Sequence, residues 1–267
     1  MTSSNSLIQN RSKRKLEAGG LVLCMGVNQM RTPDIAMIAA ACDFDALYID
    51  LEHSPTSMES ASGICIAAAG CGVTPIARAK CQDAHHLTLL LDIGAQGLMV
   101  PHVETAEEAR AIVSACRYPP LGKRSVPAPG PSLAYRARSQ SQDNSLVNSN
   151  VLVIAMIESA QAVRNIEAIA AVDGIDAIHF GTHDLSADLG VDGQFRHPKM
   201  VDAFERGLRA SKKHGKSAGV GGIWSDPDYQ ASLVQKGFRY LTLGVDVTLM
   251  MAAASRETAR ARAISLG

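Results

Sequence analysis

Short apolar runs alternate with helical segments along almost the whole chain, and the runs are rich in Val, Ile and Leu rather than alternating with polar residues. Continuous runs of this kind are typical of parallel strands that are buried on both faces. Eight of them are expected to be strands: residues 21–27, 46–50, 74–79, 97–103, 151–157, 177–181, 217–223 and 240–246. The regular spacing of strands and helices predicts a single-domain (β/α)8 barrel, an α/β fold, over residues 1–267.

An open, doubly wound sheet is the structural alternative, but no G-x-G-x-x-G follows the first predicted strand. Two segments depart from the regular rhythm. Residues 1–10 are expected to be frayed. Residues 117–150 form a long excursion that carries much of the chain's proline. Because long loops in a compact domain are seldom inert, this excursion is predicted to be a lid or an interface element.

Composition excludes several classes of function. Lys plus Arg equal Asp plus Glu at 26 each, so no global charge favours nucleic acid or a membrane surface. No apolar run is long enough to cross a bilayer. The six cysteines are scattered without C-x-x-C spacing, and the polar start lacks the apolar segment of a signal peptide. These features predict reduced thiols in a cytoplasmic protein.

Two acids follow the fifth and sixth predicted strands, Glu158 after an apolar run and Asp184 after GTH. Because a helix separates the two strands, both acids are expected at the same carboxyl-terminal edge of the sheet. Two carboxylates that converge there repel each other unless a cation joins them, and oxygen ligands of this kind suit Mg²⁺ or Mn²⁺. Ordinary strand-end caps are the alternative interpretation.

Other polar residues are expected at the same end of the barrel: Asp50, Glu52, His53, His102, Thr182, His183, Asp246 and, in an otherwise apolar strand, Arg78. The Arg78 guanidinium must be paired, and its fork matches a carboxylate or an enolate oxygen. An internal ion pair with Glu52 or Asp50 is the alternative for Arg78. His53 could accept and return a proton at neutral pH, although it could also be a surface loop residue.

No lysine occupies the carboxyl end of a predicted strand, so a Schiff-base mechanism lacks an obvious amine. A metal ion must then polarise the substrate. A 2-oxo acid can chelate such an ion through its carboxylate and its carbonyl. These residues therefore predict carbon–carbon bond chemistry at a metal enolate.

Several segments resemble the class II, metal-dependent pyruvate aldolases, the 4-hydroxy-2-oxoheptanedioate and 2-keto-3-deoxyglucarate aldolase family. They are IDLEHSP (49–55), Arg78, LLDIGAQGLMVPHVETAEEA (90–109), RYPPLGKRS (117–125), MIES (156–159) and GTHDLSADLG (181–190). The resemblance covers nearly the whole chain in order. The wider superfamily includes malyl- and citramalyl-CoA lyases and a fungal macrophomate synthase.

The resemblance implies a role for each candidate residue. Glu158 and Asp184 would bind the divalent metal (Mg²⁺, Mn²⁺ or Co²⁺), Arg78 the enolate oxygen, and His53 would be the acid–base group. Asp50 or Asp92 would orient that histidine. The pyruvate carboxylate would lie on backbone amides of the 181–184 turn, and the substrate-binding residues are therefore Gly181, Thr182, His183 and Arg78.

The chain also departs from the family pattern. Met156 stands where Gln is frequent, Thr182 and His183 replace the usual Pro and Asn or Ala, and Ser125 replaces a usual Gly. These departures affect the aldehyde side of the site more than the metal side, so the substrate stays open.

The expected activity is reversible cleavage of a 4-hydroxy-2-oxo acid to pyruvate and an aldehyde. The alternatives are a CoA-ester lyase of the malyl or citramalyl type, a phosphate-binding barrel isomerase with GVGG (219–222) as its loop, and a non-catalytic barrel that binds metal and oxo acid. The resemblance further implies a homo-oligomer, a hexamer, in which the last helix packs on a neighbouring subunit. Neither nucleic acid nor a membrane is expected as a partner.

Overall fold

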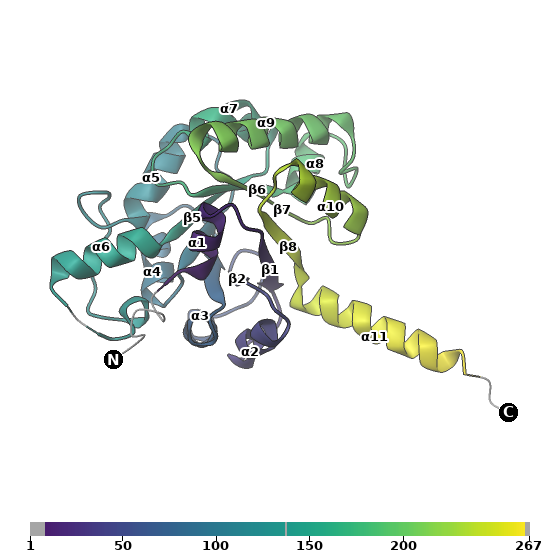
Figure 1. Ribbon diagram of the computed structural model, residues 1–267, viewed down its shortest axis with the longest axis horizontal. Coiled ribbons are helices and arrows are strands. Elements are labelled where there is room, and N and C mark those ends of the chain that lie inside the picture. The colour runs from purple at the N-terminus through teal and green to yellow at the C-terminus, as the bar shows by residue number, and fades with distance from the viewer. Residues whose placement is uncertain (1–8, 137, 265–267) are drawn as a thin grey trace.

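Eight parallel strands form a closed barrel in the order of the sequence (Figure 1). The structure is a computed structural model and describes residues 9–136 and 138–264. The strands are β1 (Val22–Val27), β2 (Ala46–Asp50), β3 (Thr74–Arg78), β4 (Gly97–Val100), β5 (Leu152–Ile157), β6 (Ala177–Gly181), β7 (Ser217–Gly221) and β8 (Tyr240–Val245). The predicted (β/α)8 barrel is thus confirmed.

Helices follow the strands and surround the barrel. They are α1 (Arg11–Glu17), α2 (Asp34–Ala41), α3 (Met58–Cys71), α4 (Ala84–Asp92), α5 (Ala106–Cys116), α6 (Gln140–Asn150), α7 (Ala160–Ala170), α8 (Thr182–Asp188), α9 (Pro198–His214), α10 (Pro227–Lys236) and α11 (Asp246–Arg262), with a short 3₁₀ helix at Pro131–Leu133. Local signals set many boundaries. Ser57 caps the first turn of α3, for example, and Gly72 ends that helix with a left-handed φ of 80°.

Apolar side chains pack in two layers. The larger layer lies between the strands and the surrounding helices, and a smaller one fills the barrel itself with residues such as Ile76, Met99, Met156 and Tyr240. Buried strands need apolar residues on both faces, which explains the continuous runs in the sequence.

The start of the described chain is more ordered than expected. Residues 1–8 of the segment predicted to be frayed lie outside the described residues. Asn10 is buried, however, and its side chain accepts a hydrogen bond from the Lys13 N–H and donates one to the Gln96 carbonyl (2.9 Å each). Including Asn10 in the frayed segment was therefore wrong, because its amide group joins α1 to the barrel.

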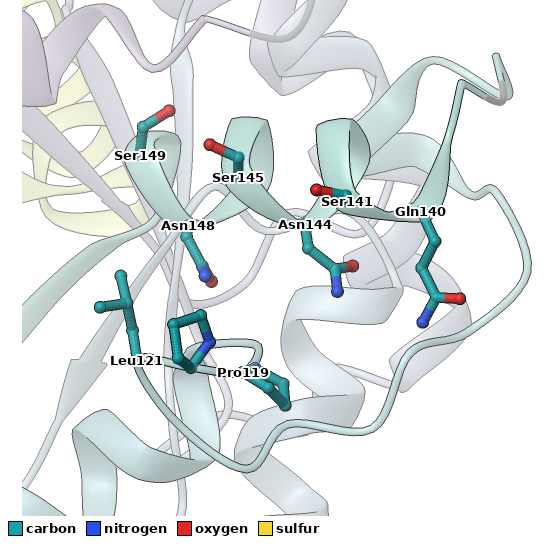
Figure 2. Close-up of a pocket in the computed structure, with 9 residues that line it drawn as sticks. Pro119, Leu121, Gln140, Ser141, Asn144, Ser145, Asn148 and Ser149 are labelled. Atoms are coloured by element: carbon teal, nitrogen blue, oxygen red, sulfur yellow. The ribbon is translucent and has the colours of Figure 1, made fainter.

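The excursion at 117–150 contains a helix, α6, which begins with a capping box at Ser139 and Gln142. The segment connects the end of α5 to the start of β5, and both lie at the amino-terminal end of the barrel. A cavity of about 810 Å³ lies between residues 119–121 and one face of α6, where Ser, Asn and Gln side chains gather (Figure 2). A lid over the strands' carboxyl ends does not fit this position, and the interface role stays a prediction.

The last helix, α11, projects away from the barrel (Figure 1). Its first residue is fixed: the Asp246 carboxylate accepts hydrogen bonds from the backbone N–H groups of Asn28, Gln29 and Met30. Beyond the first turn its side chains are exposed. None of the helices that the structure describes is long and apolar enough to cross a membrane.

Candidate active site

A pocket of about 310 Å³ opens at the carboxyl-terminal ends of the strands. Most of the residues singled out in the sequence line it: His53, Arg78, Glu158, Gly181, Thr182, His183 and Asp184. Asp50 lies directly behind Arg78. Asp92 does not line the pocket, because it ends α4 at the other end of the barrel, where its carboxylate pairs with Arg124 (2.6 Å).

Arg78 is held by Asp50 from the neighbouring strand. The register of β2 and β3 places the two residues opposite each other, and the guanidinium donates two hydrogen bonds to the fully buried carboxylate (2.9 and 2.6 Å). Burial alone would raise the pKa of Asp50, but the hydrogen bonds and charge of Arg78 lower it below its usual value. The predicted ion pair is present, and it fixes the guanidinium at the wall of the pocket.

Glu158 extends β5 into the pocket and is almost completely buried. Burial raises the pKa of its carboxyl group, and the negative charges of Glu52 and Asp184 add to this effect, while the N–H of His102 opposes it. That N–H lies 2.8 Å from Glu158 Oε2. His102 has a left-handed φ of 54°, a conformation that non-glycine residues rarely adopt and that is often found at functional sites.

Asp184 lies in the first turn of α8, which begins directly after β6. Gly181 makes this close approach possible, because a Cβ at this position would lie 2.4 Å from Glu158 Oε1. Thr182 is buried and its hydroxyl donates to the Gly221 carbonyl (2.7 Å), so its side chain does not face the pocket as a free donor. The acid pair therefore faces one cavity from two adjacent strands.

His183 is exposed at the pocket wall and packs against two aromatic rings. Its imidazole meets Phe195 edge-on at 5.2 Å and lies 5.8 Å from the ring of Trp224. Trp224 also lines the pocket. No role was predicted for Trp224, since it follows β7 in a segment without any motif.

His53 lies beside Glu52 rather than beside either predicted orienting acid. Its Nε2 is 3.7 Å from Glu52 Oε2. Asp50 contacts His53 through the backbone N–H (3.1 Å) and not through the imidazole ring. Glu52 also lies 3.5 Å from Arg78 and 3.3 Å from His102 Nε2. The orienting role predicted for Asp50 or Asp92 is thus not what this single chain shows, because both carboxylates are engaged by arginines.

His179 lies inside the barrel at the floor of the pocket. Burial lowers its pKa to about 3, and the charge of Arg78 acts in the same direction, so its imidazole is neutral. Two glycines of β7 leave room for the ring: a Cβ on Gly219 or Gly221 would lie 2.9 or 3.1 Å from it. This packing role explains GVGG without a phosphate loop, as that segment lies within β7 and just after it.

The acids present suit a divalent cation. The negative charge of Asp184 disfavours the charged form of Glu158, and among the described residues neither acid has an arginine or lysine partner. Among the described residues, no three His, Cys, Asp or Glu side chains are grouped so as to hold a metal ion by themselves. An ion here would therefore need ligands beyond the protein's side chains, which substrate and water can supply.

One end of this barrel thus carries acids that can bind a cation and, next to them, groups that can bind an anion. This arrangement defines a (β/α)8 enzyme that acts on a small molecule bearing a carboxylate. A sequence model of the HpcH/HpaI aldolase/citrate lyase family matches residues 28–253. The chain is 37% identical over 248 residues to 4-hydroxy-4-methyl-2-oxoglutarate aldolase of Chaetomium globosum, with 92% of each chain covered. It is also 37% identical over 235 residues to hydroxypyruvate/pyruvate aldolase of Cupriavidus necator, covering 87% of this chain and 86% of the other.

The structural comparison agrees. The crystal structure of an HpcH/HpaI aldolase from Desulfitobacterium hafniense superimposes with a TM-score of 0.90 at 31% identity, covering 95% of this chain and 97% of that one. The chain belongs to the HpcH/HpaI aldolase/citrate lyase family. The family resemblance, the fold and the assignment as an aldolase, a carbon–carbon lyase, are confirmed, and the aldolase is supported over the CoA-ester lyase.

Proposed function

We propose that this chain cleaves a 4-hydroxy-2-oxo acid, reversibly, to pyruvate and an aldehyde, with a divalent metal ion held by Glu158 and Asp184. The observation that carries the proposal is the acid pair itself. Glu158 is buried at the end of β5 with a raised pKa, and Asp184 lines the same pocket. A bound Mg²⁺, Mn²⁺ or Co²⁺ would supply positive charge that polarises the 2-oxo group.

The protein's own groups account for the other requirements. The backbone amides of the 181–184 turn belong to the start of α8, where N–H groups lack helical partners, and they suit the substrate carboxylate. Asp50 occupies Nε and Nη2 of Arg78, and the remaining nitrogen, Nη1, lies 3.5 Å from Glu52 Oε2 at the pocket wall, where it can also donate to substrate. The charge of Arg78 opposes the negative charge that develops on the 2-oxo oxygen.

Proton transfer is assigned to His53 with Glu52 beside it. The base removes the proton of the 4-hydroxyl group, the C3–C4 bond breaks, and the aldehyde leaves while the electron pair passes to the enolate of pyruvate. Protonation of C3 then gives pyruvate. Glu52 Oε2 lies 3.7 Å from Nε2 of this imidazole.

The His183, Phe195 and Trp224 rings are proposed to form the aldehyde side of the pocket. His183 is the residue before Asp184, and the rings of Phe195 and Trp224 pack on His183. This wall stands where the chain departs from the family pattern, so it is the place to look for acceptor preference.

The test is exchange of the pyruvate methyl protons with D₂O, followed by NMR, together with titration of Mn²⁺ by calorimetry. Glu158→Gln and Asp184→Asn should each abolish exchange and weaken Mn²⁺ binding, because one of two protein ligands is lost. Asp192→Asn, an exposed acid near α8, is the control and should behave as wild type. Full exchange in a chelated wild-type sample would contradict the metal role.

We propose further that the protein works as a homo-oligomer, a hexamer, in the cytoplasm, with small molecules as its only other partners. The exposed outer part of α11 supports the first point. The six cysteines, all free, support a reducing compartment.

A further inference from the structure

A second pocket, which we call the basal pocket, lies at the other end of the barrel from the candidate active site. It has a volume of about 340 Å³ and lies between the ends of α9 and α10, the starts of β7 and β8, and α1. Its charged lining residues are Arg209, Lys212, Lys216, Lys236 and Arg239. No acidic residue lines it. This is a marked local excess in a chain with equal numbers of acidic and basic residues.

Helix dipoles explain only part of this excess. Lys212 and Lys236 lie in the last turns of α9 and α10, where cations are favourable next to the helix carbonyls. Arg209 lies more than one turn before the end of α9. Lys216 and Arg239 come after the glycines that end the two helices. Three of the five cations therefore need another explanation.

Most of these cations are free to bind. Among the described residues, Arg209, Lys212 and Lys216 make no ion pair and no side-chain hydrogen bond, although Lys216 is half-buried. Lys236 lies 3.6 Å from Glu205. Arg239 is fixed because its Nε and Nη1 donate to three backbone carbonyls, and Nη2 has no acceptor in the part of the chain that the structure describes.

Ser211 provides an independent sign of a missing ligand. It lines the basal pocket, only 3% of it is exposed, and its hydroxyl is buried with no hydrogen-bond partner. A buried hydroxyl without a partner costs free energy, so such groups are usually satisfied. An oxygen-bearing ligand in the pocket would supply the acceptor once the Ser211 side chain turns its hydroxyl, which has almost no accessible surface, toward the pocket.

We propose that the basal pocket binds the phosphate group of a small molecule. A phosphate carries a charge between about −1.5 and −2 at neutral pH and three acceptor oxygens, which matches several point cations and one hydroxyl better than a single carboxylate does. The volume lies in the range of small-molecule sites. Because the ligand would join α9, α10 and the base of the barrel, it would stabilise the folded chain by mass action.

Binding is tested directly by calorimetry with inorganic phosphate, pyrophosphate and glucose 6-phosphate, at low salt and with a chelator present. At least one should bind saturably, and the comparison separates a free phosphate from a phosphate ester. The double variant Arg209→Gln/Lys216→Gln should weaken that binding at least tenfold. The control is Lys213→Gln, which lies on α9 like Arg209 but pairs with Glu167 of α7, and it should change the binding less than twofold.

Two further measurements make the test decisive. Ser211→Ala should weaken binding several-fold without lowering the stability of the unliganded protein, since its hydroxyl has no partner to lose. Glu158→Gln should bind the phosphate probe as wild type does, which separates this inference from the proposed function. Saturable binding of none of the three probes, an equal loss in Lys213→Gln, or tighter binding of a single-stranded oligonucleotide would overturn the proposal.

Discussion

Arg78 illustrates how a structural role and a proposed catalytic role can belong to one residue. Its side chain neutralises the buried carboxylate of Asp50, and it also forms part of the pocket wall. The two interpretations of Arg78 that the sequence left open are therefore compatible. The ion pair with Asp50 orients the guanidinium, and its Nη1, which lies 3.5 Å from Glu52, is the nitrogen left for substrate.

Arg78→Ala should lower both stability and activity. It would leave Asp50 buried without its partner, a change that costs about 3–5 kcal/mol of unfolding free energy. Loss of the charge facing the developing oxyanion should cost on the order of 3 kcal/mol in activation free energy, roughly 100-fold in kcat. Denaturant unfolding and pyruvate proton exchange measure the two effects. Arg206→Ala, which removes an exposed ion pair with Asp202, should cost less than about 1 kcal/mol.

His179 should make the stability of the protein fall with acidity. Its pKa is about 3 in the folded chain against 6.5 for the free group, so only the unfolded chain binds a proton between these values. Stability is then complete above about pH 6.5 and falls by about 1.4 kcal/mol per pH unit below it. Denaturant unfolding at fixed protein concentration, between about pH 7 and pH 4.5, measures the slope. His179→Gln should reduce that slope by one proton, and an unchanged slope would exclude His179 as its source.

Sequence reasoning found site residues where chemistry was unusual for the position. Arg78 in an apolar strand and the acids Glu158 and Asp184 after apolar runs were all singled out, and the structure brings them to one pocket. His179 was missed because it lies within a strand whose other residues are apolar. Glu52 was named only as a possible ion-pair partner of Arg78, since its closeness to His53 and His102 as well depends on three different strand ends.

At the scale of single elements, the start of α8 decides the geometry of the acid pair. Gly181 has an ordinary φ of −84°, so glycine is needed there for space rather than for backbone freedom. Any side chain would press on the Glu158 carboxylate. The helix that carries Asp184 can therefore begin against β5 only because this residue has no Cβ.

Gly181→Ala should lower kcat/KM for aldol cleavage at least tenfold, because either Glu158 or the first turn of α8 must move. Gly70→Ala is the matched control. A Cβ at Gly70 meets no heavy atom within 4 Å, and the position lies inside α3, so this change should raise the unfolding free energy by about 0.5–1 kcal/mol and leave activity intact. Equal activity of Gly181→Ala and wild type would show that the contact is relieved without moving the acids.

Elements with strong periodic signals were predictable, whereas α6 was not. The barrel strands follow from their apolar runs, and α5 from Thr105 with Glu107 and Glu108 in its first turn. Helix α6 has the sequence QSQDNSLVNSN, which is rich in Ser and Asn and lacks a wide apolar face. Only the capping box at Ser139 and Gln142 signals it, and packing around Val147 and Asn148 does the rest.

At the scale of the whole molecule, α11 is unusual because most of its length lacks tertiary packing within the described chain. Most helical stability in proteins comes from packing an apolar face against other elements. Beyond its first turn, α11 packs on no other element among the described residues. Met250 and Met251 are 54% and 60% exposed in the single chain. This is the pattern expected if a neighbouring subunit covers the helix.

Met250→Glu/Met251→Glu should therefore reduce the wild-type oligomer, expected to be a hexamer, to smaller species in sedimentation velocity. Placing two charges in an apolar interface carries a large desolvation cost, whereas on a solvated helix they cost little. Glu257→Gln, on the same exposed helix, removes only exposed pairs with Arg256 and Arg260 and should leave the assembly unchanged. The distribution should shift without loss of helical signal from the barrel, because Asp246 still fixes the start of α11. A monomeric wild-type protein, or an unchanged oligomer in the double variant, would mean that these methionines face solvent.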